Sequence, residues 1–328
     1  MKLPHRRQFL HLAAGAAALP FAPQVARAQA YPTRPITLIV PFGAGGPTDV
    51  FARIVAEHMS RTLGQRLVVE NVAGAGATTA TTRTMRANPD GYTIQIGHTG
   101  THATALAFYP NLAYRPDSDF APIGMIALNA YFIVANKNLA PRDLAEFIDY
   151  AKANSEKLNM GHAGVGSNTY LVGLLLNTIL SVKPTMVPFN STAQVMTAMI
   201  AGHVDYMAGP AAEAIPQFQG GTIKVFAVAS AERSKALAQI PTTREAGLPE
   251  FQVQTWNGLF APKGTPKPIL DLLTNALDQA LDDETTRSRI FDLGSEIPLK
   301  SDRGQAPLAA LVKSEIARWT PIIKAASN

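Results

Sequence analysis

The sequence predicts an α/β fold of two lobes, each a mostly parallel sheet flanked by helices. Short apolar strands alternate with loops and helices along the chain, an order typical of parallel sheets covered on both faces. The chain has 328 residues, and 298 remain when a predicted leader of 30 is subtracted, a length that suits two domains better than one. Loops rich in glycine and hydroxyl groups follow several strands, where ligands of such sheets bind.

Residues 1–30 have the features of a bacterial export signal. Arg6 and Arg7 form a twin-arginine pair, an apolar stretch runs to Ala22, and Ala28-Gln29-Ala30 fits a small-residue cleavage site. A membrane anchor is the alternative, but prolines interrupt the stretch, which falls short of the roughly 20 apolar residues that a span needs. We therefore expect the protein to be exported folded and to work in the periplasm.

The composition limits the partners that we expect. Cysteine is absent, so no disulfide can stabilise the fold. Of 29 basic residues four lie in the leader, which leaves 25 against 24 acidic residues and a net charge of +1. A nearly neutral chain without a basic stripe argues against nucleic acid as a partner.

The first half of the chain predicts strands and helices in alternation. Each expected strand is a short apolar or alternating run: 36–40, 66–70, 92–97 and 131–135. Helices are expected after the capping pair Thr48-Asp49, at 77–87 and at 101–108, with a strong turn at 88–91.

The second half repeats this order. Helices are expected from Pro141 to Lys152, at 168–180 and at 192–201, and strands at 185–187, 204–207 and 223–228, with a turn at 161–166. An apolar and aromatic segment covers 252–260, and three amphipathic helical stretches follow Pro266 and end near Lys324.

Four loops share a composition that suits an anion. They offer backbone N–H groups, hydroxyls and amides with few full charges, and they lie at 41–49, 98–102, 161–169 and 188–192. Hydrogen bonds to a charged acceptor contribute roughly 1.5 to 3 kcal/mol each. The sequence therefore predicts a receptor for a small anion such as a carboxylate.

Each loop also has a simpler interpretation. The glycines at 43–46 can serve only as a tight connection, and Asp49 can be a helix cap rather than a ligand contact. The loop is not a dinucleotide fingerprint, because the sixth position lacks glycine and Pro47 removes a donor, and no Walker lysine follows.

Metal binding and catalysis find little support in the sequence. His98 and His102 have a spacing at which helical imidazoles can share a metal, but Gly100 lies between them and no HExxH glutamate is present. Ser167 does not lie in a GxSxG elbow. Trp256 either lines a cleft or fills an interdomain core. We expect no metal, no bound cofactor and no catalytic residue.

Ordered motifs over the whole mature chain carry a family resemblance. The chain resembles the periplasmic solute-binding receptors of tripartite tricarboxylate transporters, often called the Bug family. The matching segments are YPTRPITLIVPFGAGGPTDVFAR from Tyr31, VVENVAGAGAT from Val68, ANPDGYT from Ala87, TGTHA from Thr99, DFAPIGMIA from Asp119, AGVGS from Ala163, VDYM from Val204, AVASAERS from Ala227, PTTREAGLP from Pro241 and WNGLFAPKGTP from Trp256.

The resemblance implies a two-lobed Venus-flytrap fold that closes on a small carboxylate. Two crossovers would join a first lobe of residues 31–130 plus 253–328 to a second of 131–252. In relatives the ligand's proximal carboxylate is held, often through water, by the glycine loop and by main-chain groups of the facing loop. Carried over residue by residue, that implies a site of Phe42, Ala44, Gly45, Gly46, Thr99, Thr101, Gly166, Ser167, Asn168 and Thr169.

The chain departs from the family pattern where the far end of the ligand is expected. Ser-Ser-His-Leu is replaced by the segment 168–171, the following glutamate by Leu174, and Tyr-Lys-Gly by the segment 189–191, so Asn190 becomes a candidate contact. The common Phe-Asp is replaced by Ala208-Gly209, which makes Gly209 another. Loss of an aspartate that could meet an ammonium, and a larger pocket, favour a dicarboxylate or aromatic carboxylate over an amino acid.

Three functions compete at this stage. The leading one is a monomeric receptor that delivers a carboxylate to the membrane permease subunits of a tripartite transporter. The second keeps the same binding event but couples it to a sensor kinase. The third, an exported hydrolase or reductase, would need a nucleophile, metal set or cofactor loop that the sequence does not offer.

Overall fold

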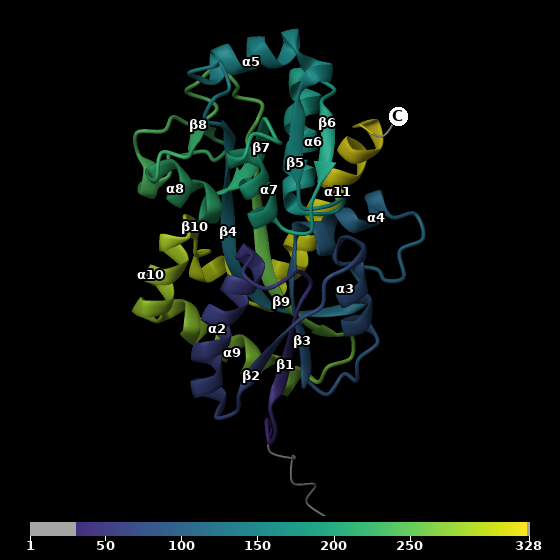
Figure 1. Ribbon diagram of the computed structural model, residues 1–328. Helices are drawn as coiled ribbons and strands as arrows, with labels where there is room; N and C mark the ends of the chain where they lie inside the picture. Colours follow the sequence, from purple (N-terminus) through teal and green to yellow (C-terminus); the bar gives the residue numbers. More distant parts are fainter. Residues whose placement is uncertain (1–30, 327–328) are drawn as a thin grey trace, which may run out of the picture.

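The computed structural model describes residues 31–326 of the chain, so the predicted export signal lies outside the described residues. The molecule has two lobes, one above the other in Figure 1, and both chain termini of the described part lie at its surface. Between residues 31 and 326, none of the helices has the length and apolar character needed to cross a bilayer.

The first lobe, the lower one in Figure 1, is built on a sheet that begins with three parallel strands. The strands β1 (Ile36–Val40), β2 (Leu67–Asn71) and β3 (Thr93–His98) pair in the order β2-β1-β3. The helices α2 (Pro47–Leu63), α3 (Thr78–Met85) and α9 (Lys267–Asp282) cover this sheet, and α10 (Glu284–Asp292) packs against α2 and α9. Side chains such as Phe51, Val55 and Leu273 fill the core between them.

The second lobe has its own parallel strands, β5 (Asn159–His162), β6 (Thr185–Pro188) and β7 (Tyr206–Pro210), in the order β7-β5-β6. The strand β8 (Ile223–Val228) joins this lobe by pairing with a strand, described below, that also pairs with β7. The helices of this lobe are α5 (Leu144–Ala153), α6 (Asn168–Leu180), α7 (Thr192–Ile200) and α8 (Ala211–Gln219). Two buried clusters, one containing Phe147 and Tyr206 and the other Phe132 and Met207, form its core.

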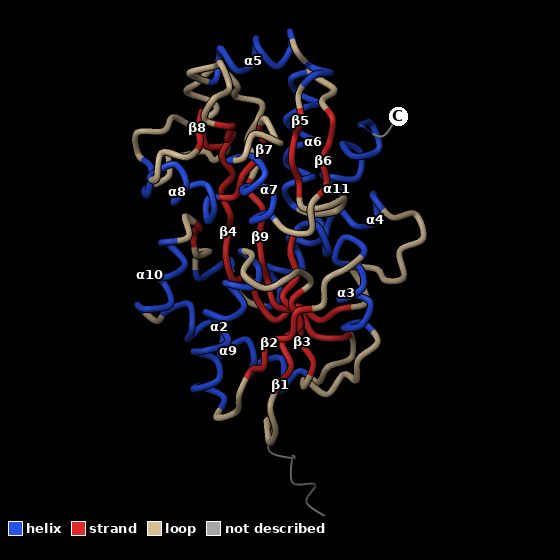
Figure 2. The backbone as a smooth tube through the Cα atoms, in the orientation of Figure 1, coloured by secondary structure: helices blue, strands red, loops and turns tan. Residues whose placement is uncertain are grey.

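One long strand joins the lobes. β4 (Phe120–Asn136) pairs with β9 (Gln254–Pro262) through residues 120–130 and with β7 and β8 through residues 131–136. β9 returns the chain to the first lobe, and the two strands run side by side between the lobes in Figure 2. Asn129 and Tyr131 therefore lie where one sheet gives way to the other, which we call the hinge.

The crossover strands make both sheets mixed. β4 pairs antiparallel with β7, β8, β9 and the short β10 (Ser295–Glu296), and β3 pairs antiparallel with β9. The two-lobed α/β class is as the sequence predicts. The expectation of mostly parallel sheets holds for the strand groups β2-β1-β3 and β7-β5-β6. The crossover strands β4 and β9 run in opposite directions, because one enters the second lobe and the other leaves it.

Local differences from the sequence prediction have physical reasons. The helix α8, which is not among the helices predicted from the sequence, spans only nine residues and contains Pro216, a residue that usually marks the end of a helix. The segment 100–104 forms a π-helix before α4 (Ala105–Phe108). The last helix, α11 (Gln305–Ala326), starts in the first lobe but places Trp319 and Ile323 in a core of the second. The expected boundaries assign the whole of 253–328 to the first lobe.

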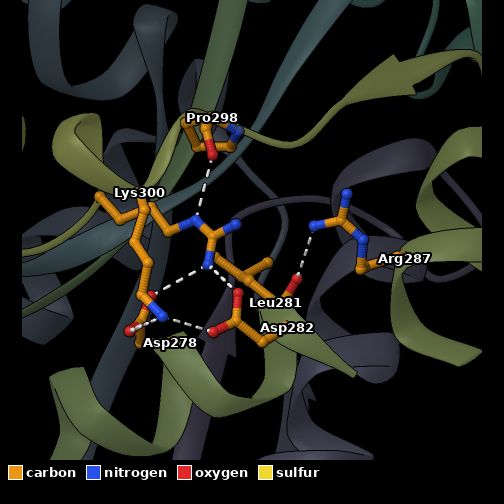
Figure 3. Close-up of polar contacts among 7 residues, drawn as sticks. Asp278, Leu281, Asp282, Arg287, Pro298 and Lys300 are labelled. Carbon is orange, nitrogen blue, oxygen red and sulfur yellow. Dashed lines mark hydrogen bonds and ion pairs between the residues drawn. The ribbon is translucent and has the colours of Figure 1, made fainter. Parts of the chain in front are cut away.

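An ion-pair network fastens the start of the C-terminal segment to α9. Arg303 contacts Asp278 at 3.0 Å and Asp282 at 2.6 Å, and its Nε donates to the carbonyl of Pro298 at 3.0 Å. Lys300 pairs with Asp282 from the exposed side at 2.8 Å, as Figure 3 shows. These contacts fix the turn that leads into α11.

Candidate ligand-binding site

A cavity lies between the lobes. Its volume is about 60 Å³ measured at the centres of water-sized spheres, several times the roughly 10–15 Å³ that one water needs. None of its lining residues carries a charged side chain. The wall consists of Phe42, Gly43, Gly46, Pro47, Thr48, Phe51, Asn129, Tyr131, Ala163, Ser167, Asn168, Thr169, Ser191, Thr192, Pro210, Ala211, Ala212, Asn257 and Ser295.

Four helices begin at this wall. The residues that precede their first turns are Gly46 for α2, Ser167 for α6, Ser191 for α7 and Pro210 for α8. The first N–H groups of a helix have no intrahelical acceptor, and the helix dipole gives them a partial positive charge. An anion in the cavity would therefore be surrounded by donors without any cationic side chain.

The capping serines leave part of each first turn free. The Ser167 hydroxyl accepts from the backbone N–H of Tyr170 at 3.2 Å, and Ser191 accepts from that of Gln194 at 3.3 Å. Each cap satisfies the third N–H of its helix. The N–H groups of Asn168, Thr169 and Thr192 remain for a ligand.

Asp49 braces the glycine loop instead of facing the cavity. Its carboxylate accepts from the Gly45 N–H, from Arg53 and from Asn71, each at 2.9 Å. Burial alone would raise the pKa of Asp49, but these hydrogen bonds together lower it, so the carboxylate stays ionised. Arg53 balances its charge. Asp49 therefore has a structural role in the loop and is not part of the cavity wall.

Asn168 connects the two lobes beside the cavity. Its side-chain oxygen accepts from the Gly100 N–H at 3.1 Å and lies 3.1 Å from the His98 ring, and its amide donates to Thr255 at 3.2 Å. Burial lowers the pKa of His98 to about 4, partly offset by Asn168, so the ring is neutral near pH 7. The facing loop is thus held to the first lobe through neutral groups.

Of the site residues predicted in the first lobe, some line the cavity and the others lie behind or beside the lining residues. Phe42 and Gly46 line the cavity. Ala44 and Gly45 lie at the exposed tip of the loop, and Gly45 has given its N–H to Asp49. Thr99, just before the π-helix, and Thr101 within it are buried away from the wall. The Thr99 hydroxyl accepts from the backbone N–H of Trp256, and that of Thr101 bonds to the backbone of His98.

In the second lobe the wall includes Ser167, Asn168 and Thr169. Gly166 instead packs against Tyr109, whose hydroxyl would lie 2.8 Å from an added Cβ. Asn190 is exposed, while its neighbours Ser191 and Thr192 reach the cavity. Gly209 is absent from the cavity wall, and a Cβ added there would meet Val134 at 2.9 Å.

Sequence reasoning missed four polar residues of the cavity wall: Asn129 and Tyr131 at the hinge, and Asn257 and Ser295, which bond to Asn129. A signal was available, because asparagine inside an apolar strand needs a polar partner. Recognising it required knowing that β4 and β9 cross between the lobes side by side.

The residues considered for metal binding or catalysis have structural partners. His102 is fully buried and stacks on Phe260 with ring centres 3.8 Å apart, and burial lowers its pKa. The Ser167 hydroxyl donates to the Gly164 carbonyl at 2.7 Å. Trp256 lies in a core cluster with Leu308 and Val312. Across residues 31–326 no histidine, cysteine or acidic side chains form a metal-binding group.

Comparison with known proteins gives one consistent family. The family model described as "Tripartite tricarboxylate transporter family receptor" matches residues 51–327. A protein from Agrobacterium vitis, encoded in the TAR-I ttuE-ttuC' intergenic region, is 38% identical over 308 residues, which cover 93% of this chain and 88% of the relative.

Solved structures agree. MatC from Rhodopseudomonas palustris, solved with bound malate, has a TM-score of 0.86 and 45% identity, over 89% of this chain and 100% of MatC. Another R. palustris protein, solved with adipate, has a TM-score of 0.85 and 32% identity, over 90% of this chain and 98% of the other. The chain therefore belongs to the family of tripartite tricarboxylate transporter receptors, which are solute-binding proteins and not enzymes.

Proposed function

We propose that the protein captures a small dicarboxylate in the interlobe cavity, outside the cytoplasm, and presents it to the membrane subunits of a tripartite tricarboxylate-type transporter. The observation that carries this proposal is the cavity wall, where four helices begin and no side chain is charged. Such a wall attracts an anion through oriented N–H groups.

The chemistry of the wall suits capture followed by release. Neutral donors fixed on helices are already arranged for the ligand, so binding requires little ordering of side chains. A bound ligand would contact both lobes and stabilise their closed arrangement by its higher affinity for it. The membrane subunits would then recognise that closed surface.

Two solved relatives support the ligand class. One holds malate and the other adipate, at 45% and 32% identity to this chain. Both are aliphatic dicarboxylates of different length. We therefore place dicarboxylates before aromatic carboxylates and amino acids for this protein.

A thermal-unfolding screen tests the function. Residues 31–328 would be unfolded and refolded to remove any bound ligand, then heated with aliphatic dicarboxylates, aromatic carboxylates, tricarboxylates and amino acids. A ligand at a hundred times its Kd adds about 2.7 kcal/mol, which raises the Tm by roughly 5–10 °C for a chain of this size. We expect that rise with a dicarboxylate. A rise with amino acids alone, or none across the panel, would contradict the proposal.

A further inference from the structure

We propose that the hinge end of the cavity is a second subsite, in which Asn257 and Tyr131 donate hydrogen bonds to an oxygen of the ligand's far group. This inference rests on the proposed function, because it assigns the recognition of the group that makes the ligand a dicarboxylate. Asn257 and Tyr131, which line the cavity, would then select the ligand's far group, whereas Gly209 is absent from the wall.

An unpaired donor identifies the subsite. Asn257 lines the cavity and is only 2% exposed, yet its side-chain nitrogen Nδ2 has no hydrogen-bond partner. A buried amide without a partner costs about 1–3 kcal/mol. Most buried polar groups are paired, so this one indicates a partner that arrives with the ligand.

A chain of hydrogen bonds fixes which end of the Asn257 amide is free. Asn129 Nδ2 donates to the backbone carbonyl of Thr255 at 3.3 Å, and a carbonyl can only accept. The same nitrogen donates to Asn257 Oδ1 at 2.8 Å, while Asn129 Oδ1 accepts from the Ser295 hydroxyl at 3.2 Å. Asn257 must therefore direct its oxygen to Asn129, and its nitrogen is the end of the amide that lacks a partner.

Tyr131 offers a second donor on the same cavity wall. Its hydroxyl oxygen accepts from the Thr255 hydroxyl at 3.4 Å, and Thr255 in turn accepts from Asn168 at 3.2 Å. Each of these hydroxyls has one proton, so that of Tyr131 is left without an acceptor. Burial raises the pKa of Tyr131, so the proton is retained. The residue lines the cavity.

The two donors define the chemistry of the far group. An oxygen of a carboxylate satisfies both, whereas a methyl group leaves both unpaired. An ammonium has only donors, so it cannot accept from Asn257 Nδ2. The subsite therefore favours dicarboxylates over monocarboxylates of equal length and over ligands with an ammonium at that end.

Matched ligand pairs test the subsite by titration calorimetry. Succinate, glutarate and adipate are each compared with butyrate, valerate or hexanoate, in which a methyl replaces the far carboxylate. We expect Asn257→Leu to weaken the preferred diacid about 10- to 100-fold, the range for hydrogen bonds to a charged acceptor, and to leave its monoacid nearly unchanged. Asn129 keeps its hydrogen bond to the Thr255 carbonyl in this variant but loses the one to Asn257 Oδ1, so urea unfolding of the variant is measured alongside its affinity.

Two further variants make the result decisive. Asn138→Leu makes the same substitution at an exposed position away from the cavity and should bind as wild type. Tyr131→Phe removes only a hydroxyl and should also weaken the diacid alone; it decides the outcome if Asn257→Leu does not unfold cooperatively.

The outcomes separate the subsite from the proposed function. Equal loss of diacid and monoacid, or no loss of either, would overturn the subsite and leave the receptor function intact. Tighter binding of 4-aminobutyrate, in which a protonated aminomethyl group replaces the far carboxylate, than of succinate would do the same. A wild-type protein that binds no carboxylate in any pair would overturn both.

Discussion

Gly46 is a position of the cavity wall with room for a small side chain. It precedes α2 with extended backbone angles, φ −78° and ψ 166°, and an added Cβ would meet nothing closer than the Gly43 carbonyl at 3.9 Å. Asparagine and aspartate are both favourable residues at such a position, so either should preserve the fold. Only aspartate adds a negative charge at the wall.

We expect Gly46→Asp to lower carboxylate affinity by more than about 100-fold, because two anions would share a poorly hydrated cavity. Gly46→Asn has nearly the same size and should retain measurable binding. Calorimetry on both variants measures the difference. If the aspartate variant bound as tightly as the asparagine variant, the ligand's carboxylate would not lie near this helix.

Glu213 predicts an unusual dependence of stability on pH. It lies in the first turn of α8, and neither carboxylate oxygen has a hydrogen-bond partner in another residue. Burial raises its pKa from 4.5 to about 8. Between these values the unfolded chain releases a proton that the folded protein keeps, so this group reduces stability as pH rises, by about 1.4 kcal/mol per unit.

Glu213→Gln removes that titration. In urea unfolding of the ligand-free protein we expect the variant to be more stable than wild type by about 2–4 kcal/mol at pH 8.5, with the gap shrinking toward pH 5. Glu250→Gln, at an exposed position, should keep the wild-type pH dependence. A gap of the same size at both pH values would mean that Glu213 does not titrate in this range.

The turn before α11 depends on one buried cation. The side chain of Arg303 is only 8% exposed, and it joins two aspartates of α9 to the Pro298 carbonyl. Lys300 contacts the same two aspartates (Figure 3). Its side chain is 70% exposed.

We expect Arg303→Met to cost about 1–3 kcal/mol of unfolding free energy, because it leaves the Pro298 carbonyl and two carboxylates without their shared donor. Lys300→Met removes an exposed ion pair and should cost less than about 1 kcal/mol. Urea unfolding compares them. Equal costs would show that the network acts only through exposed charges.

Elements with strong local signals could be predicted from the sequence. The helix at 168–180 and the strand at 223–228 have the predicted bounds, because an apolar run or a capping serine marks each end. The first half of β4 was missed because its residues resemble a loop, with Pro122 and Gly124 in it. Its pairing with β9, more than a hundred residues away, decides the strand.

The site divides in the same way. Helix starts follow local sequence, so the loops at Gly46 and Ser167 could be located in advance. Asn129 and Asn257 could not, because they meet only once two distant strands pair. The sequence also made Gly209 a candidate ligand contact. In the folded strand a side chain at this position would point at Val134 and not into the cavity.

Contacts between the lobes outside the cavity give the whole molecule a means to adjust affinity. Tyr109, in the first lobe, donates to the Val165 carbonyl of the second at 2.7 Å, and it is absent from the cavity wall. If the ligand binds the closed arrangement, any contact that favours closure also favours binding.

Tyr109→Phe should therefore weaken carboxylate binding about fivefold, since one net hydrogen bond contributes about 1 kcal/mol to closure. Tyr92→Phe, at the far base of the first lobe where the hydroxyl contacts Thr33, should leave the Kd unchanged. Calorimetry on both distinguishes them. An unaltered Kd in the Tyr109 variant would mean that this contact does not separate when the ligand leaves.

A crystal structure of the mature protein with its preferred dicarboxylate most directly tests how the molecule binds an anion. The ligand should lie between the lobes, with one carboxylate within hydrogen-bond distance, directly or through one water, of the first-turn N–H groups of Thr48, Asn168, Thr169 or Thr192. A dicarboxylate bound outside this cavity, or held there by a lysine or arginine side chain, would contradict a site built from helix N-termini.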